Sequence, residues 1–197
     1  MARSRRSPSN DAPARGALLD AAESLMLEEG YAAVTTRRVA TRAGVNNGLI
    51  HYYFGTMDSM FVDLFRRSVG RSFAQMPTTS STQPLWEMWE AMRDFSGNAL
   101  MSEFIALSNH RPLVREEIAS QSALVREAHV VEMSRVLASY GVVEPEASPA
   151  AIGLLMMGTA RFLQMEAAFG LTVGHDDLIQ VIERRIAMLE GDRIRTA

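Results

Sequence analysis

The chain has 197 residues, 47% of them hydrophobic, and a formal net charge of −3 at pH 7. This composition predicts a soluble globular protein with a sizeable core and excludes disorder over the whole length. The chain has no cysteine, which excludes disulfide frameworks, thiolate zinc sites and cysteine nucleophiles. It is compatible with the reducing cytoplasm, where we expect the protein to be located.

The small net charge conceals an asymmetry. Residues 1–71 hold 10 arginines and 7 acidic residues, a formal charge of +3, whereas residues 72–197 hold 10 arginines and 16 acidic residues, a charge of −6. A basic part joined to an acidic part suits a protein that meets phosphate at one end. Within residues 1–12, Arg3, Arg5 and Arg6 are followed by no apolar stretch, which predicts a disordered arm and no secretory signal.

Helical periodicity starts after Pro13 and ends at Gly30. The twenty residues from Thr35 to Phe54, TTRRVATRAGVNNGLIHYYF, then predict two short helices separated by a tight turn. Thr35 and Thr36 supply a hydroxyl N-cap for the first helix, and Gly44 permits the left-handed turn that ends it. This order of signals is typical of a helix-turn-helix unit.

The second short helix has two different faces. Asn46 or Asn47 can cap it, while Leu49, Ile50 and Phe54 offer an apolar inner face. The outer face is polar and aromatic and consists of Asn47, His51 and Tyr52. We therefore expect the outer face to contact DNA.

The rest of the chain is predicted to be helical. A longer helix starts near Thr56 and runs to about Phe73, and residues 76–84 are the best candidate for a linker. Further helices are expected at residues 85–97, 99–109, 113–140, 149–169 and 176–190. Because no alternating strand pattern of any length occurs, the predicted fold class is all-α.

The last two predicted helices carry much apolar surface. Residues 150–160 are uncharged, but Arg161 ends this run after 11 residues, well short of the roughly 20 that a bilayer requires. We therefore expect burial in protein and no membrane partner. The final helix places Leu178, Ile182, Ile186 and Leu189 in one stripe, and two adjacent helices of this kind suggest a subunit interface.

The run from Arg15 to Phe65 resembles the tetracycline-repressor (TetR) family of bacterial transcription regulators over about a quarter of the chain. The residues that carry the resemblance are Ala21-Ala22, Gly30, Thr35-Thr36, Val39-Ala40, Ala43-Gly44-Val45, Gly48 and Tyr53-Phe54. Their joint spacing makes the resemblance strong. The remainder matches the family only in length and helical layout.

The resemblance implies an Ω-shaped homodimer of about nine helices per chain. Residues 13–55 would form a three-helix DNA-binding domain, and residues 56–197 a larger helical domain for ligand binding and dimerisation. Helices 149–169 and 176–190 would form the dimer interface, in agreement with their apolar surfaces. A two-fold dimer binds a palindromic operator in double-stranded DNA, and a small-molecule effector would release it.

By position, the resemblance places Thr36 at the cap of the first short helix, where it would contact a phosphate together with Arg37 or Arg38. The two arginines are equally compatible with a solvated helix face. Asn46 and Asn47 lie where bases are contacted, and Asn47 can pair with adenine. The alternative is that both residues only cap the helix. Gly48 would allow a close approach, and Tyr52 and Tyr53 would donate to phosphate.

Two positions depart from the family pattern. His51 stands where a tyrosine is usual, so a side chain whose charge can change near neutrality replaces a phenol. Tighter DNA binding toward pH 6 would follow, unless His51 is a neutral contact or packing residue. Met57 stands where a lysine is usual, and the arginines of the N-terminal arm would compensate for its absence by binding the minor groove.

The larger domain contains many adaptable apolar side chains that suit an effector cavity, and equally an ordinary core. A few polar residues among them could orient a ligand. The candidate effector contacts are Trp89, Met92, Phe95, Phe104, His110, His129, Met133, Met157, Arg161, Phe162 and Met165. Arg161 could instead pair with an acid such as Glu166.

No catalytic motif, metal-ligand spacing or cofactor motif is present. The favoured function is a ligand-responsive transcriptional regulator, a repressor released from its operator by a small, largely apolar effector. A constitutive or architectural DNA-binding dimer is the alternative, and an all-helical enzyme is disfavoured. The effector, the operator and the regulated genes cannot be named from the sequence.

Overall fold

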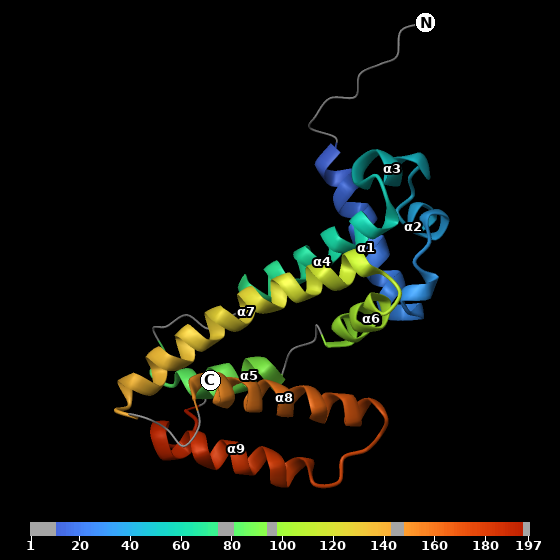
Figure 1. Ribbon diagram of the computed structural model, residues 1–197. Helices are drawn as coiled ribbons and strands as arrows, with labels where there is room; N and C mark the ends of the chain where they lie inside the picture. The colour runs from blue at the N-terminus through green and yellow to red at the C-terminus, as the bar shows by residue number, and fades with distance from the viewer. Residues whose placement is uncertain (1–10, 75–80, 94–97, 143–147, 195–197) are drawn as a thin grey trace, which may run out of the picture. The chain divides into compact units, whose positions relative to one another are not determined.

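The computed structural model describes residues 11–74, 81–93, 98–142 and 148–194. In these ranges the chain forms nine α-helices and one short 3-10 helix, and no strand (Figure 1). This confirms the predicted all-α fold. The described residues form two compact units, the first comprising those up to Ser72 together with Ala99–Gln121, and the second comprising the others.

The helices of the N-terminal part agree closely with the sequence pattern. They are α1 (Asp11–Glu29), the 3-10 helix η2 (Tyr31–Ala33), α2 (Thr36–Arg42), α3 (Gly48–Phe54) and α4 (Met57–Ala74). Because α1 begins at Asp11, residues 11 and 12 are helical and do not belong to an arm. Arg3, Arg5 and Arg6 lie outside the described residues.

The later helices also start and end near the predicted residues. They are α5 (Pro84–Arg93), α6 (Asn98–Ser108), α7 (Pro112–Ser139), α8 (Pro149–Ala168) and α9 (His175–Glu190). The ends of α8 and α9 differ by no more than one residue from those expected. Most of the expected linker, residues 76–84, lies outside the described residues, but Gln83 is buried and Pro84 is the first residue of α5.

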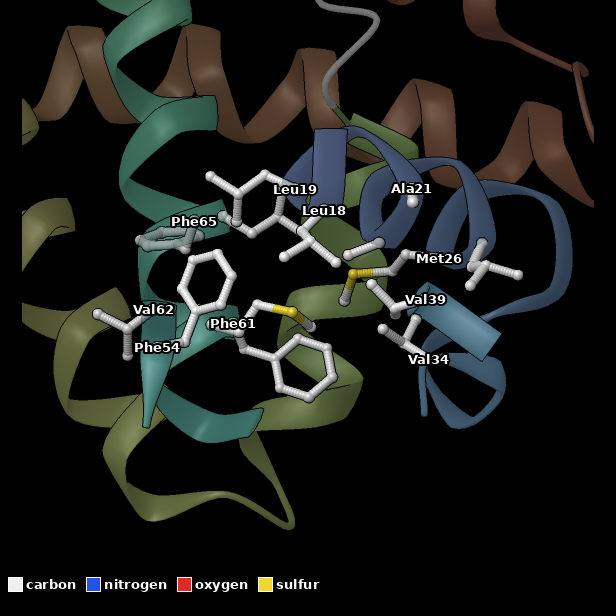
Figure 2. Close-up of a cluster of buried hydrophobic side chains, with 14 of the residues drawn as sticks. Leu18, Leu19, Ala21, Met26, Val34, Val39, Phe54, Phe61, Val62 and Phe65 are labelled. Atoms are coloured by element: carbon white, nitrogen blue, oxygen red, sulfur yellow. The ribbon is translucent and has the colours of Figure 1, made fainter. Parts of the chain in front are cut away.

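The first unit is built around one apolar core (Figure 2). Leu18 and Leu25 of α1 pack with Val39 of α2, Ile50 of α3 and Phe61 of α4, and all five side chains are at most 2% exposed. Burying side chains of this size stabilises the unit by roughly 1.5–3 kcal/mol each. The core therefore holds the short helices α2 and α3, which are too short to be stable alone.

Helix α6 also belongs to the first unit. Phe104 packs edge-on against Phe65 of α4 with ring centroids 5.1 Å apart. The carboxylate of Glu103 accepts a hydrogen bond of 2.7 Å from the backbone N–H of Tyr31, directly after the turn at Gly30. This contact ties η2, which leads into α2, to α6.

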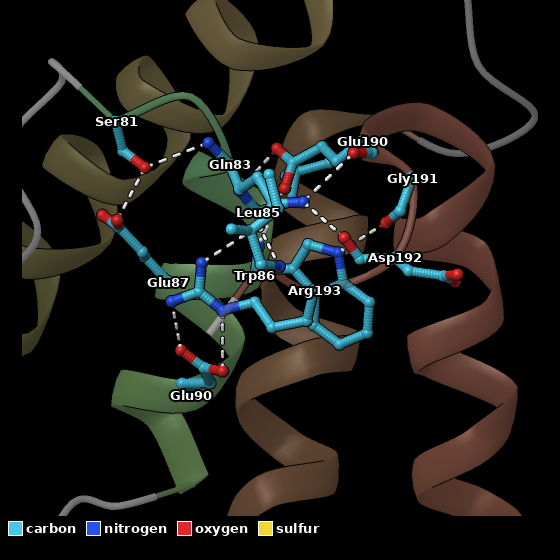
Figure 3. Close-up of polar contacts among 11 residues, drawn as sticks. Ser81, Gln83, Leu85, Trp86, Glu87, Glu90, Glu190, Gly191, Asp192 and Arg193 are labelled. Carbon is cyan, nitrogen blue, oxygen red and sulfur yellow. Dashed lines mark hydrogen bonds and ion pairs between the residues drawn. The ribbon is translucent and has the colours of Figure 1, made fainter. Parts of the chain in front are cut away.

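The second unit has a separate core between α5, α8, α9 and the later part of α7. Its buried members include Trp89, Met133, Met156 and Ile182. The C-terminal end of α9 is joined to the start of α5 by a polar network (Figure 3). There the carboxylate of Glu190 accepts hydrogen bonds from the first backbone amides of α5, which have no partner within their own helix.

Candidate DNA-binding interface

The start of α2 is capped by Thr35. Its backbone is extended, and its Oγ1 accepts a hydrogen bond of 3.4 Å from the N–H of Arg38. Thr36, which the resemblance placed at the cap, is instead the first helical residue. The cap falls on Thr35 because that residue has the non-helical backbone from which a side chain can reach the third helical amide.

The turn between α2 and α3 follows the predicted pattern. Gly44 has a left-handed backbone with φ of 66°, and the N–H of Val45 returns to the carbonyl of Ala40 at 3.0 Å. The half-buried Val45 packs against the apolar core of the first unit. The angle at which α3 leaves the turn is thus held by both the backbone and the core.

The two asparagines at the start of α3 have different surroundings. Asn46 Oδ1 accepts a hydrogen bond of 2.8 Å from the N–H of Gly48, whereas Asn47 makes no side-chain capping bond. A Cβ added to Gly48 would lie 3.3 Å from Asn46 Oδ1, a tight contact. The hydrogen bond of Asn46 therefore favours glycine at residue 48. The amide of Asn47 is exposed and available to an external partner, so the base contact stays a prediction for Asn47.

The outer face of α3 is polar and exposed. His51 is exposed, and its Nδ1 lies 3.0 Å from the carbonyl of Gly55. Nδ1 therefore acts as the donor, and Nε2 is left for other contacts. Tyr52 is 69% exposed, while Tyr53 is half-buried and meets Tyr52 edge-on, with ring centroids 4.9 Å apart.

The exposed face of α2 carries three arginines, two of them paired with acids at the end of α1. Arg38 donates to Glu29, and Arg42 lies 2.7 Å from Glu28. The hydrogen bond from Arg38 holds the pKa of Glu29 below its usual value. Arg37 is exposed and has no ion pair within the described residues. Glu28 and Glu29 were not predicted as functional residues, although the sequence places two acids at the end of one helix and three arginines on the next.

The start of α4 differs from the family pattern as the sequence indicates. Met57 packs partly buried against the apolar core of the first unit. Thr56 Oγ1 accepts a hydrogen bond of 3.0 Å from the N–H of Ser59, and Asp58 pairs with Arg111 at 2.8 Å. This end of α4 is therefore capped and locally neutralised without the usual lysine.

The residues predicted to contact an effector are divided between the two units. Phe104 is buried in the first unit, and His110 is exposed there and stacked on Tyr31 with ring centroids 6.3 Å apart. The others described belong to the second unit, where Trp89 and Met133 are buried core residues. Phe95 lies outside the described residues.

The remaining candidates in the second unit differ in exposure. His129 is half-buried on α7, and burial lowers its pKa. Its Nδ1 is buried and has no hydrogen-bond partner among the described residues. The half-buried thioethers are Met92 and Met157, whereas the α8 side chains that are exposed in the single chain are Arg161, Phe162 and Met165.

The described residues contain no group of three or more His, Asp or Glu side chains placed to hold a metal ion. None of the described helices is long and apolar enough to cross a membrane.

A capped helix, a glycine turn and a second helix with an exposed polar face, all held on one core, define a helix-turn-helix DNA-binding protein. Residues 18–64 match the family model described as "Bacterial regulatory proteins, tetR family". A curated relative, the HTH-type transcriptional regulator BetI of Rhizobium meliloti, is 37% identical over 57 residues. This match covers 29% of the chain and spans 28% of the length of BetI.

Solved structures share the fold over most of the chain. GusR of Salmonella enterica aligns with a TM-score of 0.74 at 13% identity, over 94% of this chain and 99% of its own. A protein of Saccharomonospora viridis in complex with choline aligns with a TM-score of 0.72 at 18% identity, over 89% of this chain and 96% of its own. A transcriptional regulator from Rhodococcus sp. Rha1 aligns with a TM-score of 0.67 at 21% identity, over 89% of this chain and 95% of its own.

Residues 18–64 thus match the tetR family of bacterial regulatory proteins, and the resemblance seen in the sequence is confirmed. The family model and the curated relative are those of transcriptional regulators, in agreement with the expectation that the protein is not an enzyme.

Proposed function

We propose that the protein is a ligand-responsive transcriptional repressor that binds a palindromic operator as a homodimer and leaves it when a small, largely apolar effector binds. The observation that carries the DNA-binding part is the outer face of α3. Asn47, His51 and Tyr52 are exposed there, while Ile50 and Phe54 anchor the opposite face in the core. A helix held in this way presents its polar face to a major groove.

The proposed DNA contacts are those predicted from the sequence, Asn46 included. Asn47 would contact bases, with Gly48 and His51 beside it, and Tyr52 and Tyr53 would donate to phosphate. Thr36, Arg37 and Arg38 at the start of α2 would hold the backbone. We retain residues 13–55 as the DNA-binding domain and residues 56–197 as the effector and dimerisation domain of this proposal, in a cytoplasmic protein.

The proposed dimer uses helices 149–169 and 176–190. Leu155 and Phe169 are 67% and 75% exposed on or next to α8, and Val181 and Met188 are 57% and 76% exposed on α9. Large apolar side chains that are exposed together on neighbouring helices mark a protein interface. Two-fold pairing of these helices would place two copies of α3 on one operator.

The proposed effector is small and largely apolar. The second unit offers adaptable thioether and aromatic side chains, which suit ligands of varied shape. The unpartnered Nδ1 of His129 would give such a ligand one polar contact. That one protein of the same fold was solved with choline supports a small organic molecule as the class of effector.

Selection of binding sites from random duplex DNA tests the DNA-binding part. We expect enrichment of a palindrome and a complex that contains two protein chains. Addition of choline and of a panel of small apolar molecules should identify one that releases this duplex. Failure to enrich any sequence would contradict the proposal, whereas binding that no compound reverses would favour the constitutive DNA-binding dimer.

The dimer is tested by Leu155→Glu combined with Met188→Glu. Because the two charges would be buried in the proposed interface, we expect the mass in solution to fall to that of one 21.8 kDa chain. Val131→Glu is the matched control, since Val131 on α7 is also 69% exposed and lies outside the proposed interface. Light scattering after size exclusion measures the mass.

A further inference from the structure

The acids at the end of α1 lie against the arginines of α2. Gly30, with a φ of 84°, turns the chain directly after Glu29. The turn brings Glu29 to Arg38 and Glu28 to Arg42 at 2.7 Å. Two of the three arginines on the exposed face of α2 are thus already bound to carboxylates before any DNA arrives.

Both ion pairs are exposed enough to exchange partners. The side chains of Arg38 and Glu29 are each 41% exposed, and those of Arg42 and Glu28 are 35% and 54% exposed. Water screens ion pairs of this kind, and they contribute little to stability. Arg38 donates to Glu29 through one nitrogen, Nη2, and not through the two parallel hydrogen bonds of a bidentate pair.

The same arginines line an open hollow in the surface of about 380 Å³. Its walls are Leu25, Arg37, Arg38, Thr41 and Arg42. Arg37 has no ion pair within the described residues, so the hollow combines one uncommitted guanidinium with two that carboxylates occupy. All three arginines thus border one open hollow in the surface.

We propose that Glu28 and Glu29 lower the affinity for DNA by occupying Arg42 and Arg38, and that each arginine exchanges its carboxylate for a backbone phosphate when the protein binds DNA. This inference rests on the proposed DNA-binding function. A phosphate that reaches Arg38 approaches the negative charge of Glu29, and like charges at such short range repel each other. The carboxylates therefore oppose a contact that is independent of base sequence.

The two acids would set the strength of DNA binding without touching a base. Phosphate contacts supply most of the non-specific affinity, so acids that compete for phosphate-binding arginines reduce binding to DNA of any sequence.

A double-mutant cycle on the full chain tests the exchange. Kd for the selected operator and for a random duplex is measured by fluorescence anisotropy for wild type, Glu29→Gln, Arg38→Ala and the double variant. We expect Glu29→Gln to tighten binding to both duplexes by about 3- to 10-fold, as loss of one like-charge contact permits. In the Arg38→Ala protein the same substitution should change Kd by less than about 1.5-fold, because there is no arginine left to release.

The cycle separates exchange from general repulsion. Removal of any negative charge near DNA strengthens binding, so an equal gain with and without Arg38 would overturn the proposal. An unchanged Kd for Glu29→Gln would also overturn it. A second cycle with Glu28→Gln and Arg42→Ala gives an independent answer if one variant is poorly folded.

The control is Glu117→Gln, which breaks the ion pair of Glu117 with Arg66 in the same unit, at the 2.7 Å that also separates Glu28 from Arg42. It should leave Kd unchanged, because neither residue lies on α2. If wild-type protein binds no selected duplex, the proposed function fails. If wild type binds and the cycles show no dependence on Arg38 or Arg42, only the exchange fails.

Discussion

Tyr140 donates its phenolic hydrogen to a carboxylate oxygen of Glu190 across 2.6 Å. Glu190 also accepts from the backbone amides of Leu85 and Trp86, at 2.7 and 3.1 Å. One carboxylate thus joins the residue after α7, the end of α9 and the start of α5. Burial, and then the hydrogen bond to Glu190, raise the pKa of Tyr140 to about 12.

Tyr140→Phe should lower the free energy of unfolding by about 1.5–3 kcal/mol at pH 7, as expected for a hydrogen bond to a charged group. Since the raised pKa favours the protonated phenol, its contribution is complete below the unfolded pKa near 10 and is lost as the pH rises toward about 12. Urea unfolding at pH 7 and pH 11 measures both effects. Tyr52→Phe, at a 69% exposed residue, should leave the free energy of unfolding unchanged at both pH values.

Gln83 is 3% exposed and holds the segment after α9. Its Nε2 donates to the carbonyls of Glu190 and Asp192, and its Oε1 accepts from the N–H of Ile194 at 2.8 Å. Gln83→Leu should lower the free energy of unfolding by about 2–4 kcal/mol, because buried carbonyl and amide groups lose their partners. Gln180→Leu, at an exposed residue of α9, is the control, and an equal loss in both would contradict this role.

Burial lowers the pKa of His129, so the folded protein favours the neutral imidazole. The corresponding stability is present above the unfolded pKa near 6.5 and is lost as the pH falls through the lower folded value. His129→Phe should therefore flatten the decline in the free energy of unfolding between pH 7 and pH 5. His110→Phe, at an exposed histidine, should retain the wild-type decline.

Asn47→Ala should weaken binding to the selected operator by about 10-fold, within the 1–3 kcal/mol that a bidentate base contact contributes. Binding to a random duplex should change little, because a base contact adds little to non-specific affinity. Anisotropy with the two duplexes measures the difference. Asn46→Ala, which removes the hydrogen bond from the N–H of Gly48, should weaken binding to the two duplexes about equally. If Asn46→Ala weakens binding to the operator alone and Asn47→Ala weakens both, Asn46 and not Asn47 is the residue that contacts a base.

Sequence reasoning predicted the helical elements well because their signals are local. A hydroxyl residue before an apolar run, a glycine at a left-handed position and a proline at the start of a helix act through their own backbone. Pro149 and Gly170 accordingly bracket α8 within one residue of the prediction. The inner face of α3 was also predictable, since Ile50 and Phe54 are one turn apart.

Sequence reasoning was less successful where a choice depends on distant partners. It grouped Phe104 and His110 with the effector contacts of the larger domain, whereas both belong to the unit that contains α3. Side-chain type shows what a residue can do, but not which helix will face it.

The sequence by itself determined the fold class, the helix-turn-helix and the resemblance of residues 15–65 to a family of regulators, because periodicity, caps and turns are properties of adjacent residues. Only the tertiary structure decided that Glu28 and Glu29 meet the arginines of α2, and that Gln83 is buried against the segment after α9. The first contact depends on the turn between two helices, and the second joins residues that are 109 apart in the sequence. Packing of the cores sets both contacts, and no local pattern encodes them.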